Sequence, residues 1–247
     1  MSTPNILFFG DNHRRFRHVI KAVETEKPDA IVLLGNIEPQ RPLEVELARI
    51  MGRTIIRFIH GNHDTDTHFN VRNVFESKLA HCNLDGRVEN ICGVHIAGLG
   101  GVFRGKVWTP PAEPRHRSFA EWHRAVRRSR APIGPTSVDT ILATQVRTQQ
   151  STIFPAVYDR LSLLRADVLV THEAPSCHKY GFEAIDDLAR ALGVKASFHG
   201  HHHDSLKYRD QWDVLGFQAH GVGFCGITDL DGGIVRPGDF DEYGGGV

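Results

Sequence analysis

The sequence lacks several features that would assign it to a common class. Its four cysteines include no Cys-x-x-Cys pair, no segment approaches the roughly eighteen apolar residues of a membrane span, and the formal net charge is zero. These absences argue against a Cys-rich zinc module, a membrane-spanning chain and a polybasic coat for nucleic acid. We therefore expect reduced, buried thiols, no membrane partner and no stable binding to nucleic acid.

The N-terminus also lacks the basic leader and the long apolar stretch of a signal peptide, so a cytoplasmic location is expected. Charge is nevertheless unevenly distributed. Residues 101–130 hold eight Lys or Arg against two acids, and residues 210–247 hold seven acids against one Arg. Histidine is plentiful, with 16 copies. Because histidine is the commonest metal ligand, the places where it occurs are informative.

The first 70 residues alternate between apolar strand patterns and helical patterns. Strands are expected at Asn5 to Phe9, Ala30 to Leu34 and Thr54 to Ile59, with helices between them that begin near Phe16 and Leu43. This alternation predicts a parallel sheet with helical crossovers. Further strands are expected in "RVENICGVHIAGLGG", "ADVLVTH" and "ASFHG", and helices at 153–165 and 182–192. The Gly-punctuated end of the chain predicts antiparallel hairpins, so the sheet system should be mixed.

Residues 104–150 differ from the rest of the chain because they are rich in proline and basic residues and poor in long apolar runs. Phe119, Trp122 and Val126 predict a short helix with a basic opposite face. We interpret the chain as one domain, 1–247, that carries this stretch as a cap-like insertion. The basic face is more often a solvated surface, and the alternative is that it attracts an anionic substrate.

Clusters of Asp, Asn and His follow the C-terminal ends of five expected strands, where open α/β sheets bind their ligands. We expect five loops to converge at one sheet edge. Nitrogen and oxygen donors without thiolate suit Mn, Fe or Zn, and so many donors suit two ions about 3.5–4 Å apart. The clusters are Asp11 and His13, Asn36, Asn62 with His63 and Asp64, His172, and His201 with His203.

The ordered blocks "GDNH", "GN", "GNHD", "THEAP" and "GHHH" resemble the calcineurin-like metallophosphoesterase family. The resemblance implies a four-layer α/β/β/α sandwich of two mixed β-sheets with flanking helices. It also implies two divalent metal ions, with Mn the first choice and Fe or Zn as alternatives. The implied reaction is hydrolysis of a phosphate mono- or diester, for example of a nucleotide, by a metal-bridging hydroxide.

The same resemblance assigns roles to individual residues. His63 matches the general acid and Asp64 the group that orients its ring, while Asn36 occupies the place of an aspartate that bridges the two ions. Arg14 and Arg104 lie close to the motif loops and are candidate substrate contacts. The first ion would be held by Asp11, His13 and His203, and the second by Asn62, His172 and His201.

Asn36 is a departure from the family pattern. An amide offers one neutral oxygen and an NH2 group that cannot bind a metal, so we expect weaker binding of at least one ion and low activity. An engineered Asp→Asn change is favoured, because the other motif positions are intact, and a natural variant is the alternative. Glu38 is expected to lie beyond the bridge rather than to replace it.

Glu173 is equally compatible with a supporting contact and with no role, and His202 is expected to point away from the ions because it lies between two ligand positions. The competing function is a catalytically inert module that binds a phosphorylated ligand or a partner protein in the same pocket.

Overall fold

The computed structural model describes residues 3–128 and 143–241, and the strands in this part of the chain form two five-stranded sheets. The first sheet has the order β10-β9-β1-β2-β3 and the second β4-β5-β6-β7-β8. Each sheet contains both parallel and antiparallel neighbours. The strands are β1 (Ile6–Phe9), β2 (Ala30–Leu34), β3 (Ile55–Ile59), β4 (Arg87–Ile91), β5 (Val94–Leu99), β6 (Val168–Thr171), β7 (Ala196–His199), β8 (Gln218–Gly221), β9 (Ile227–Asp229) and β10 (Ile234–Arg236).

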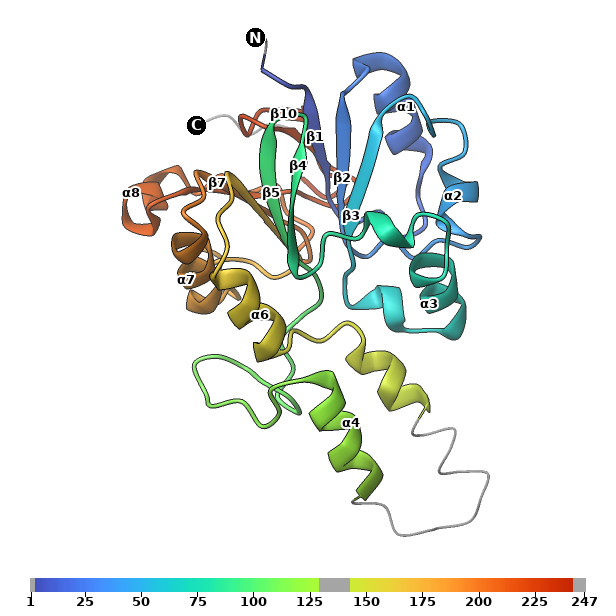
Figure 1. Ribbon diagram of the computed structural model, residues 1–247. Helices are drawn as coiled ribbons and strands as arrows, with labels where there is room; N and C mark the ends of the chain where they lie inside the picture. The colour runs from blue at the N-terminus through green and yellow to red at the C-terminus, as the bar shows by residue number, and fades with distance from the viewer. Residues whose placement is uncertain (1–2, 129–142, 242–247) are drawn as a thin grey trace.

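Helices cover the outer face of each sheet. In Figure 1, α1 and α3 lie on the side of the first sheet, and α6 and α7 lie on the side of the second. The expected four-layer α/β/β/α sandwich is therefore confirmed. The helices are α1 (Arg17–Glu26), α2 (Leu43–Glu46), α3 (His68–Phe75), α4 (Phe119–Arg128), α6 (Pro155–Ser162), α7 (Glu183–Leu192) and α8 (Trp212–Leu215), and the 3-10 turns are η1 (His63–Thr65), η2 (Ala80–Cys82) and η3 (Arg209–Gln211).

The central strands are apolar throughout because both of their faces are buried. In β1, Leu7 and Phe9 belong to the core under α1, whereas Ile6 and Phe8 belong to the core between the sheets. Phe8 stacks on Phe198 of β7 with ring centroids 3.9 Å apart, which joins the two sheets at their centre. Each such buried side chain contributes about 1.5–3 kcal/mol. This rigid centre fixes the strand ends that carry the polar clusters.

The expectation of antiparallel hairpins at the end of the chain is only partly right. β9 and β10 form one, but β8 runs parallel to β7, with Ala196 opposite Gln218. The reason is a helical crossover that the sequence pattern did not indicate. Trp212–Leu215 form α8, and Gly216 follows the helix in a left-handed conformation with φ 81°. The left-handed turn at Gly216 ends α8 and leads the chain into β8, which runs parallel to β7.

The insertion is described on either side of residues 129–142, so Arg130 lies outside the described residues. The expected helix is confirmed as α4, and residues 143–149 are also helical. Trp122 is buried with Val107 and Phe154 in a small apolar cluster that attaches the described part of the insertion to the body next to α6. Figure 1 shows α4 extending beyond α6.

Two further expectations can be compared with the described residues. All four cysteines are free; Cys82 and Cys225 are buried as expected, whereas Cys177 is half-buried and Cys92 is exposed. None of the helices in residues 3–128 and 143–241 has the length and apolar character that a membrane crossing needs. The helix expected from Leu43 to Ile50 is shorter, because regular α-helix ends at Glu46 and the chain continues in turns.

Candidate metal centre

The predicted ligand clusters do converge, but from two sheets rather than one sheet edge. The loops after β1, β2 and β3 come from the first sheet, and those after β6 and β7 come from the second. Phe8 and Phe198, which stack, lie in β1 and β7 just ahead of the loops with Asp11 and His201. Packing of the two sheets is therefore what brings the clusters into one centre.

One half of the centre is formed by Asp11, His13 and His203, which we call the first-ion half. One ligand atom from each lies within 4.8 Å of the others. His13 Nε2 is 3.1 Å from His203 Nε2, and Asp11 Oδ1 is 3.6 Å from His203 Nε2. Asp11 is fully buried. The three side chains therefore converge as the resemblance implied.

Glu38 holds His13 in place. Its Oε1 lies 2.6 Å from His13 Nδ1, so Nδ1 donates to the carboxylate and Nε2 is left with its lone pair facing Asp11 and His203. Burial raises the pKa of Glu38, but the hydrogen bonds from His13 and Arg14 outweigh it and bring the pKa below its usual value. Glu38 thus orients the His13 ring, in the arrangement that carboxylates commonly adopt behind metal-binding histidines.

The other half of the centre contains Asn62, His172 and His201, which we call the second-ion half. His172 Nδ1 donates to the Leu34 carbonyl at 2.8 Å, and burial lowers the pKa of His172 to about 3. The ring is therefore neutral, with the lone pair of Nε2 facing Asn62 Oδ1 at 3.1 Å. The His172 and His201 rings lie with centroids 4.9 Å apart.

This donor arrangement fits cations. In the second-ion half two acceptors, His172 Nε2 and Asn62 Oδ1, face each other at 3.1 Å. A cation bound by both atoms would relieve their mutual repulsion. In the first-ion half a carboxylate and two imidazoles converge within one coordination sphere. A nitrogen and oxygen donor set of this kind suits first-row divalent ions. Asp11, His13 and His203 would hold one ion, and Asn62, His172 and His201 the other.

Asn36 lies between the halves and is 1% exposed. Its Nδ2 donates to Asp11 Oδ1 at 2.9 Å, and its Oδ1 accepts from the His63 backbone N–H at 3.0 Å. Both ends of the amide are thus satisfied by protein groups. An aspartate at this position would place a carboxylate oxygen against Asp11 instead. Asn36 is therefore held against Asp11 by a direct hydrogen bond.

Two glycines, in the loops after β2 and β3, allow these loops to lie close to each other and to His172. A Cβ on Gly61 would lie 2.3 Å from Asn36 Oδ1 and 2.6 Å from His172 Cε1. A Cβ on Gly35, where φ is 97°, would lie 2.5 Å from His172 Nδ1. Asn36 and His203 themselves adopt left-handed backbone angles, with φ 48° and 65°. Such strain in non-glycine residues is typical of functional loops.

His63 lies beside the first-ion half, with its ring centroid 5.5 Å from that of His13. The expectation that Asp64 orients its ring is wrong. The Asp64 carboxylate turns inward, where it accepts from the backbone N–H groups of Glu38 and Gly61, and burial raises its pKa to about 6. Asp66 lies next to His63 instead, with Oδ2 2.5 Å from Nδ1. The single turn of η1 explains why Asp66, and not Asp64, contacts the His63 ring, because residues three apart in a 3-10 helix lie on the same side.

The two arginines differ in their surroundings. Arg14 is half-exposed and pairs with Glu38 at 2.9 Å. Arg104 donates from Nη1 to Ser151 O at 2.8 Å and to Thr152 Oγ1 at 3.1 Å, and burial lowers its pKa below the usual value. The guanidinium of Arg104 is thereby tied to the end of the insertion. A substrate contact by either arginine stays a prediction.

Two contributors to this centre were not assigned from the sequence. Asp66 would have required knowledge of η1, because the family pattern stops at Asp64. The sequence predicts only that Glu38 lies beyond the bridge, and its supporting contact with His13 depends on the left-handed backbone at Asn36 and Glu38. A carboxylate two residues after a ligand position was the available signal for Glu38.

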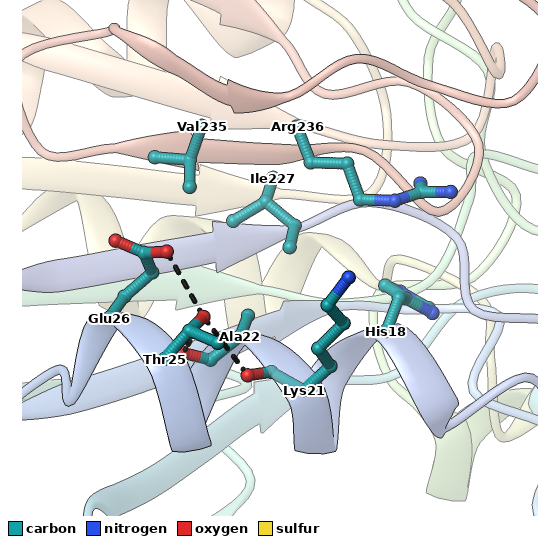
Figure 2. A pocket seen from close by; sticks show the side chains of 8 residues that line it. All are labelled: His18, Lys21, Ala22, Thr25, Glu26, Ile227, Val235 and Arg236. Atoms are coloured by element: carbon teal, nitrogen blue, oxygen red, sulfur yellow. Dashed lines mark hydrogen bonds between the residues drawn. The ribbon is translucent and has the colours of Figure 1, made fainter.

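A separate pocket lies away from the metal centre, between α1 and the strands β9 and β10 (Figure 2). Its volume is about 290 Å³. Lys21 projects from α1 and Arg236 from β10 at one end, while Thr25 and Glu26, joined by a hydrogen bond of 3.0 Å, line the other. These lining residues include none of the ligand positions described above.

Comparison with known proteins places this centre in a family. The model of the calcineurin-like phosphoesterase family matches residues 4–205. An uncharacterized protein of Haemophilus influenzae is 36% identical over 230 residues, which cover 93% of this chain and 96% of that protein. The crystal structure of TT1561 of Thermus thermophilus has a TM-score of 0.54 at 15% identity, and the match covers 93% of this chain and 96% of that one.

A further solved structure, phosphopantetheinyl hydrolase of Mycobacterium tuberculosis, has a TM-score of 0.46 at 16% identity, covering 89% of each chain. The likeness to TT1561 concerns the fold, with its two mixed sheets and flanking helices. The family match includes all five ligand loops, from Asp11 to His203. The chain therefore belongs to the calcineurin-like phosphoesterase family, which supports metal-dependent hydrolysis of phosphoesters as its general chemistry.

Proposed function

We propose that the protein hydrolyses a phosphate mono- or diester at the centre formed by the first-ion and second-ion halves, with two Mn²⁺ ions as the first choice of metal. The observation that supports this most is the convergence of five loops on two adjacent donor sets, with the His63 ring beside them. The ions, when bound, would lower the pKa of a coordinated water and offset charge on the phosphoryl oxygens.

His63 would act as the general acid. Its Nδ1 is held by Asp66, so Nε2 is the atom available to give a proton to the leaving oxygen. The side chain of His63 is 44% exposed, which leaves room for an ester to reach it. Asp66 is then a positioning residue, because it would act through the ring and not on the substrate.

The acid role can be tested with two esters that differ in leaving group. His63→Asn should slow hydrolysis of an alkyl phosphate about 10²–10⁴-fold, because a poor leaving group needs the proton. Hydrolysis of a 4-nitrophenyl ester should change far less, because nitrophenolate leaves unprotonated. Asp66→Asn is the matched variant and should give a smaller loss with the same ester preference. Equal losses for both esters in His63→Asn would contradict the role.

Activity is expected to be low because of Asn36. Its amide NH2 is directed at Asp11, a ligand of the first ion, and supplies no negative charge to the second. Asn36→Asp should therefore raise hydrolysis of 4-nitrophenyl phosphate mono- or diesters in Mn²⁺. Comparing mono- with diester rates in this variant defines the substrate class. If the variant binds two ions and hydrolyses nothing across a broad panel of phosphoesters, the proposal fails.

A second candidate is a catalytically inert module that binds a phosphorylated ligand. It is favoured by one observation, the amide of Asn36 that is satisfied on both sides by protein groups. Such a module would bind inorganic phosphate in the presence of Mn²⁺ with the same affinity in the unaltered protein and in the Asn36→Asp variant, and neither protein would turn over any ester.

A further inference from the structure

A pocket with an aromatic lining lies between the start of the insertion and the first turn of α7. Its volume is about 440 Å³, and small-molecule sites commonly enclose about 300–1,000 Å³. The described residues that line it include none of the ligand positions of the metal centre and no Lys, Arg or His. They combine aromatic rings with carboxylates, and we call this site the aromatic pocket. Its principal lining residues are Trp108, Tyr158, Phe182, Glu183 and Asp187.

The aromatic rings are held in place by one another and by the body of the protein. Trp108 and Tyr158 lie nearly perpendicular, at 84°, with ring centroids 5.3 Å apart. Phe103, which is buried, contacts both Trp108 and Phe182, with centroids 5.1 and 4.8 Å apart. The three lining rings also pack against the hydrophobic core under α7 while remaining partly exposed. The aromatic surface is therefore formed before an occupant binds.

The polar atoms of two of these rings are already used within the protein. Trp108 Nε1 donates to the Ala112 carbonyl at 3.1 Å, and the Tyr158 hydroxyl donates to the Ala184 carbonyl at 2.7 Å. Each of these side chains has a single donor, so neither has one left for an occupant. The rings therefore offer an occupant mainly their π-electron faces, which carry partial negative charge.

Carboxylates add negative charge to the aromatic pocket. Glu183 and Asp187 lie about one helical turn apart on α7, so they are on the same side of the helix. Glu183 forms no ion pair within the described part of the chain. Burial and nearby carboxylates, among them that of Asp187, raise the pKa of Tyr158 to about 12. The lining therefore contains negative charge without a cation of its own.

Arg190 is the cation that pairs with Asp187 from outside the lining. Its Nη1 is 3.3 Å from Asp187 Oδ1, but the two side chains are 46% and 69% exposed, so water screens the pair. Its Nε donates to the Leu215 carbonyl at 2.9 Å, which directs the guanidinium toward α8. This ion pair therefore leaves Glu183 available to a cation that enters the pocket.

We propose that the aromatic pocket binds an organic cation of the quaternary ammonium class, with choline as its simplest representative. The positive charge would lie against the faces of Trp108 and Tyr158, and Glu183 would offset it. A trimethylammonium group has no N–H, so it gives up no hydrogen bond on entering the pocket. A primary ammonium would bring three donors that aromatic faces do not satisfy.

Three small probes test this choice of ligand on the full-length, metal-free protein. Choline carries the quaternary ammonium, ethanolamine replaces it by a primary ammonium, and 3,3-dimethyl-1-butanol keeps the shape of choline without the charge. In calorimetric titrations, choline should bind at least about 10-fold more tightly than either of the other two.

Two variants test the place of binding. Trp108→Leu should weaken choline binding at least about 10-fold, and Glu183→Gln about 3–10-fold. Asp213→Asn is the matched control, because it removes one negative charge from the first turn of α8, outside the pocket, and should leave binding unchanged. Urea unfolding checks that each variant is folded. Glu183 is exposed, so its variant decides the question if Trp108→Leu does not fold.

Three results would overturn the proposal: no saturable binding of choline, equal binding of the uncharged alcohol, or choline binding that both variants leave unchanged. A free choline compound and a phosphatidylcholine head group share the proposed chemistry. Sedimentation with phosphatidylcholine vesicles separates these sources, because protein in the pellet assigns the site to the lipid and protein in the supernatant, with choline bound, assigns it to the free compound. No metal or ester is present, so the outcome is independent of the proposed hydrolysis.

Discussion

The two halves of the metal centre come from similar strand-to-loop turns but differ in charge. In the first-ion half, Asp11 is one of the three converging donors and Glu38 stands behind His13, so two carboxylates lie on this side. In the second-ion half, His172 is oriented by the Leu34 carbonyl, which is neutral. The donors of the first half therefore include negative charge, whereas Asn62 and His172 of the second half are neutral.

This difference shows that ligand geometry and ligand charge are separable in this fold. His172 and Asn62 are placed closely, at 3.1 Å, with no help from a carboxylate. The rigid pair of sheets sets that distance, whereas the affinity for an ion depends on anions in the loops. We therefore expect an asparagine at position 36 to change metal binding without disturbing the fold.

The largest expected effect comes from removing the ligand charge of the first half. Asp11→Asn should weaken the first ion by more than about 100-fold, beyond what is typical for a group behind a ligand. Asn62→Ala, in the second half, should cost much less because no charge is lost. Calorimetric titration of both variants with Mn²⁺ compares their losses of affinity, and equal losses would contradict the expected difference between the halves.

Asp11→Asn should also destabilise the metal-free protein. The two oxygens of Asp11 accept from Asn36 Nδ2 and from the His201 N–H, at 2.9 and 2.7 Å. An asparagine would turn its NH2 toward one of these donors in either orientation. A loss of about 1–3 kcal/mol in the free energy of unfolding is expected, measured with urea in chelator.

A smaller effect is expected from the carboxylate behind His13. Glu38→Gln should weaken the first ion about 10–100-fold, because the ring loses an anionic partner that raises its basicity. The second half contains no equivalent side chain behind His172, whose Nδ1 donates to the Leu34 carbonyl, so its ion should bind unchanged. Mn²⁺ titration followed by competition with a chelator measures both sites. An unchanged first site would mean that Glu38 only positions the loop.

Sequence patterns predicted the elements that depend on local signals. Continuous apolar runs and following glycines identified β1, β2 and β3, and the ligand types after them identified the centre. The β8 direction was missed because it depends on the four-residue helix α8, too short to leave a periodic pattern. Local sequence signals therefore predicted β1, β2 and β3, whose loops carry candidate ligands of the metal centre.

Side-chain partners were harder to predict than ligands. The family resemblance pairs Asp64 with His63, but η1 turns Asp64 inward and brings Asp66 to the ring. Glu38 reaches His13 because Asn36 and Glu38 both adopt left-handed backbone angles, which a sequence does not display. Contacts between loops of different strands form only when the sheets pack. The sequence pattern therefore predicts which residues belong to the centre, but not which of their side chains contact one another.

A further expected effect is a pH dependence that has opposite signs in the two halves of the metal-free protein. Burial lowers the pKa of His172 to about 3, so between pH 6.5 and 3 the unfolded chain binds more protons than the native one. His172 therefore costs stability as the pH falls, about 2 kcal/mol at pH 5. The interaction with Asp11 raises the pKa of His203 despite burial, so its contribution is fully present below pH 6.5 and is lost as the pH rises through the folded pKa.

Substitution of each histidine separates these contributions. Urea unfolding in chelator at pH 5 and pH 8 should show His172→Asn to be less damaging at pH 5 than at pH 8, because the acid penalty is removed. His203→Asn should be more damaging at pH 5 than at pH 8, because its charged interaction with Asp11 is removed. The pKa of Asp11 is about 2, so this partner stays ionised over the whole range. If both variants shift in the same direction, the electrostatic asymmetry between the first-ion and second-ion halves is not a property of the folded chain.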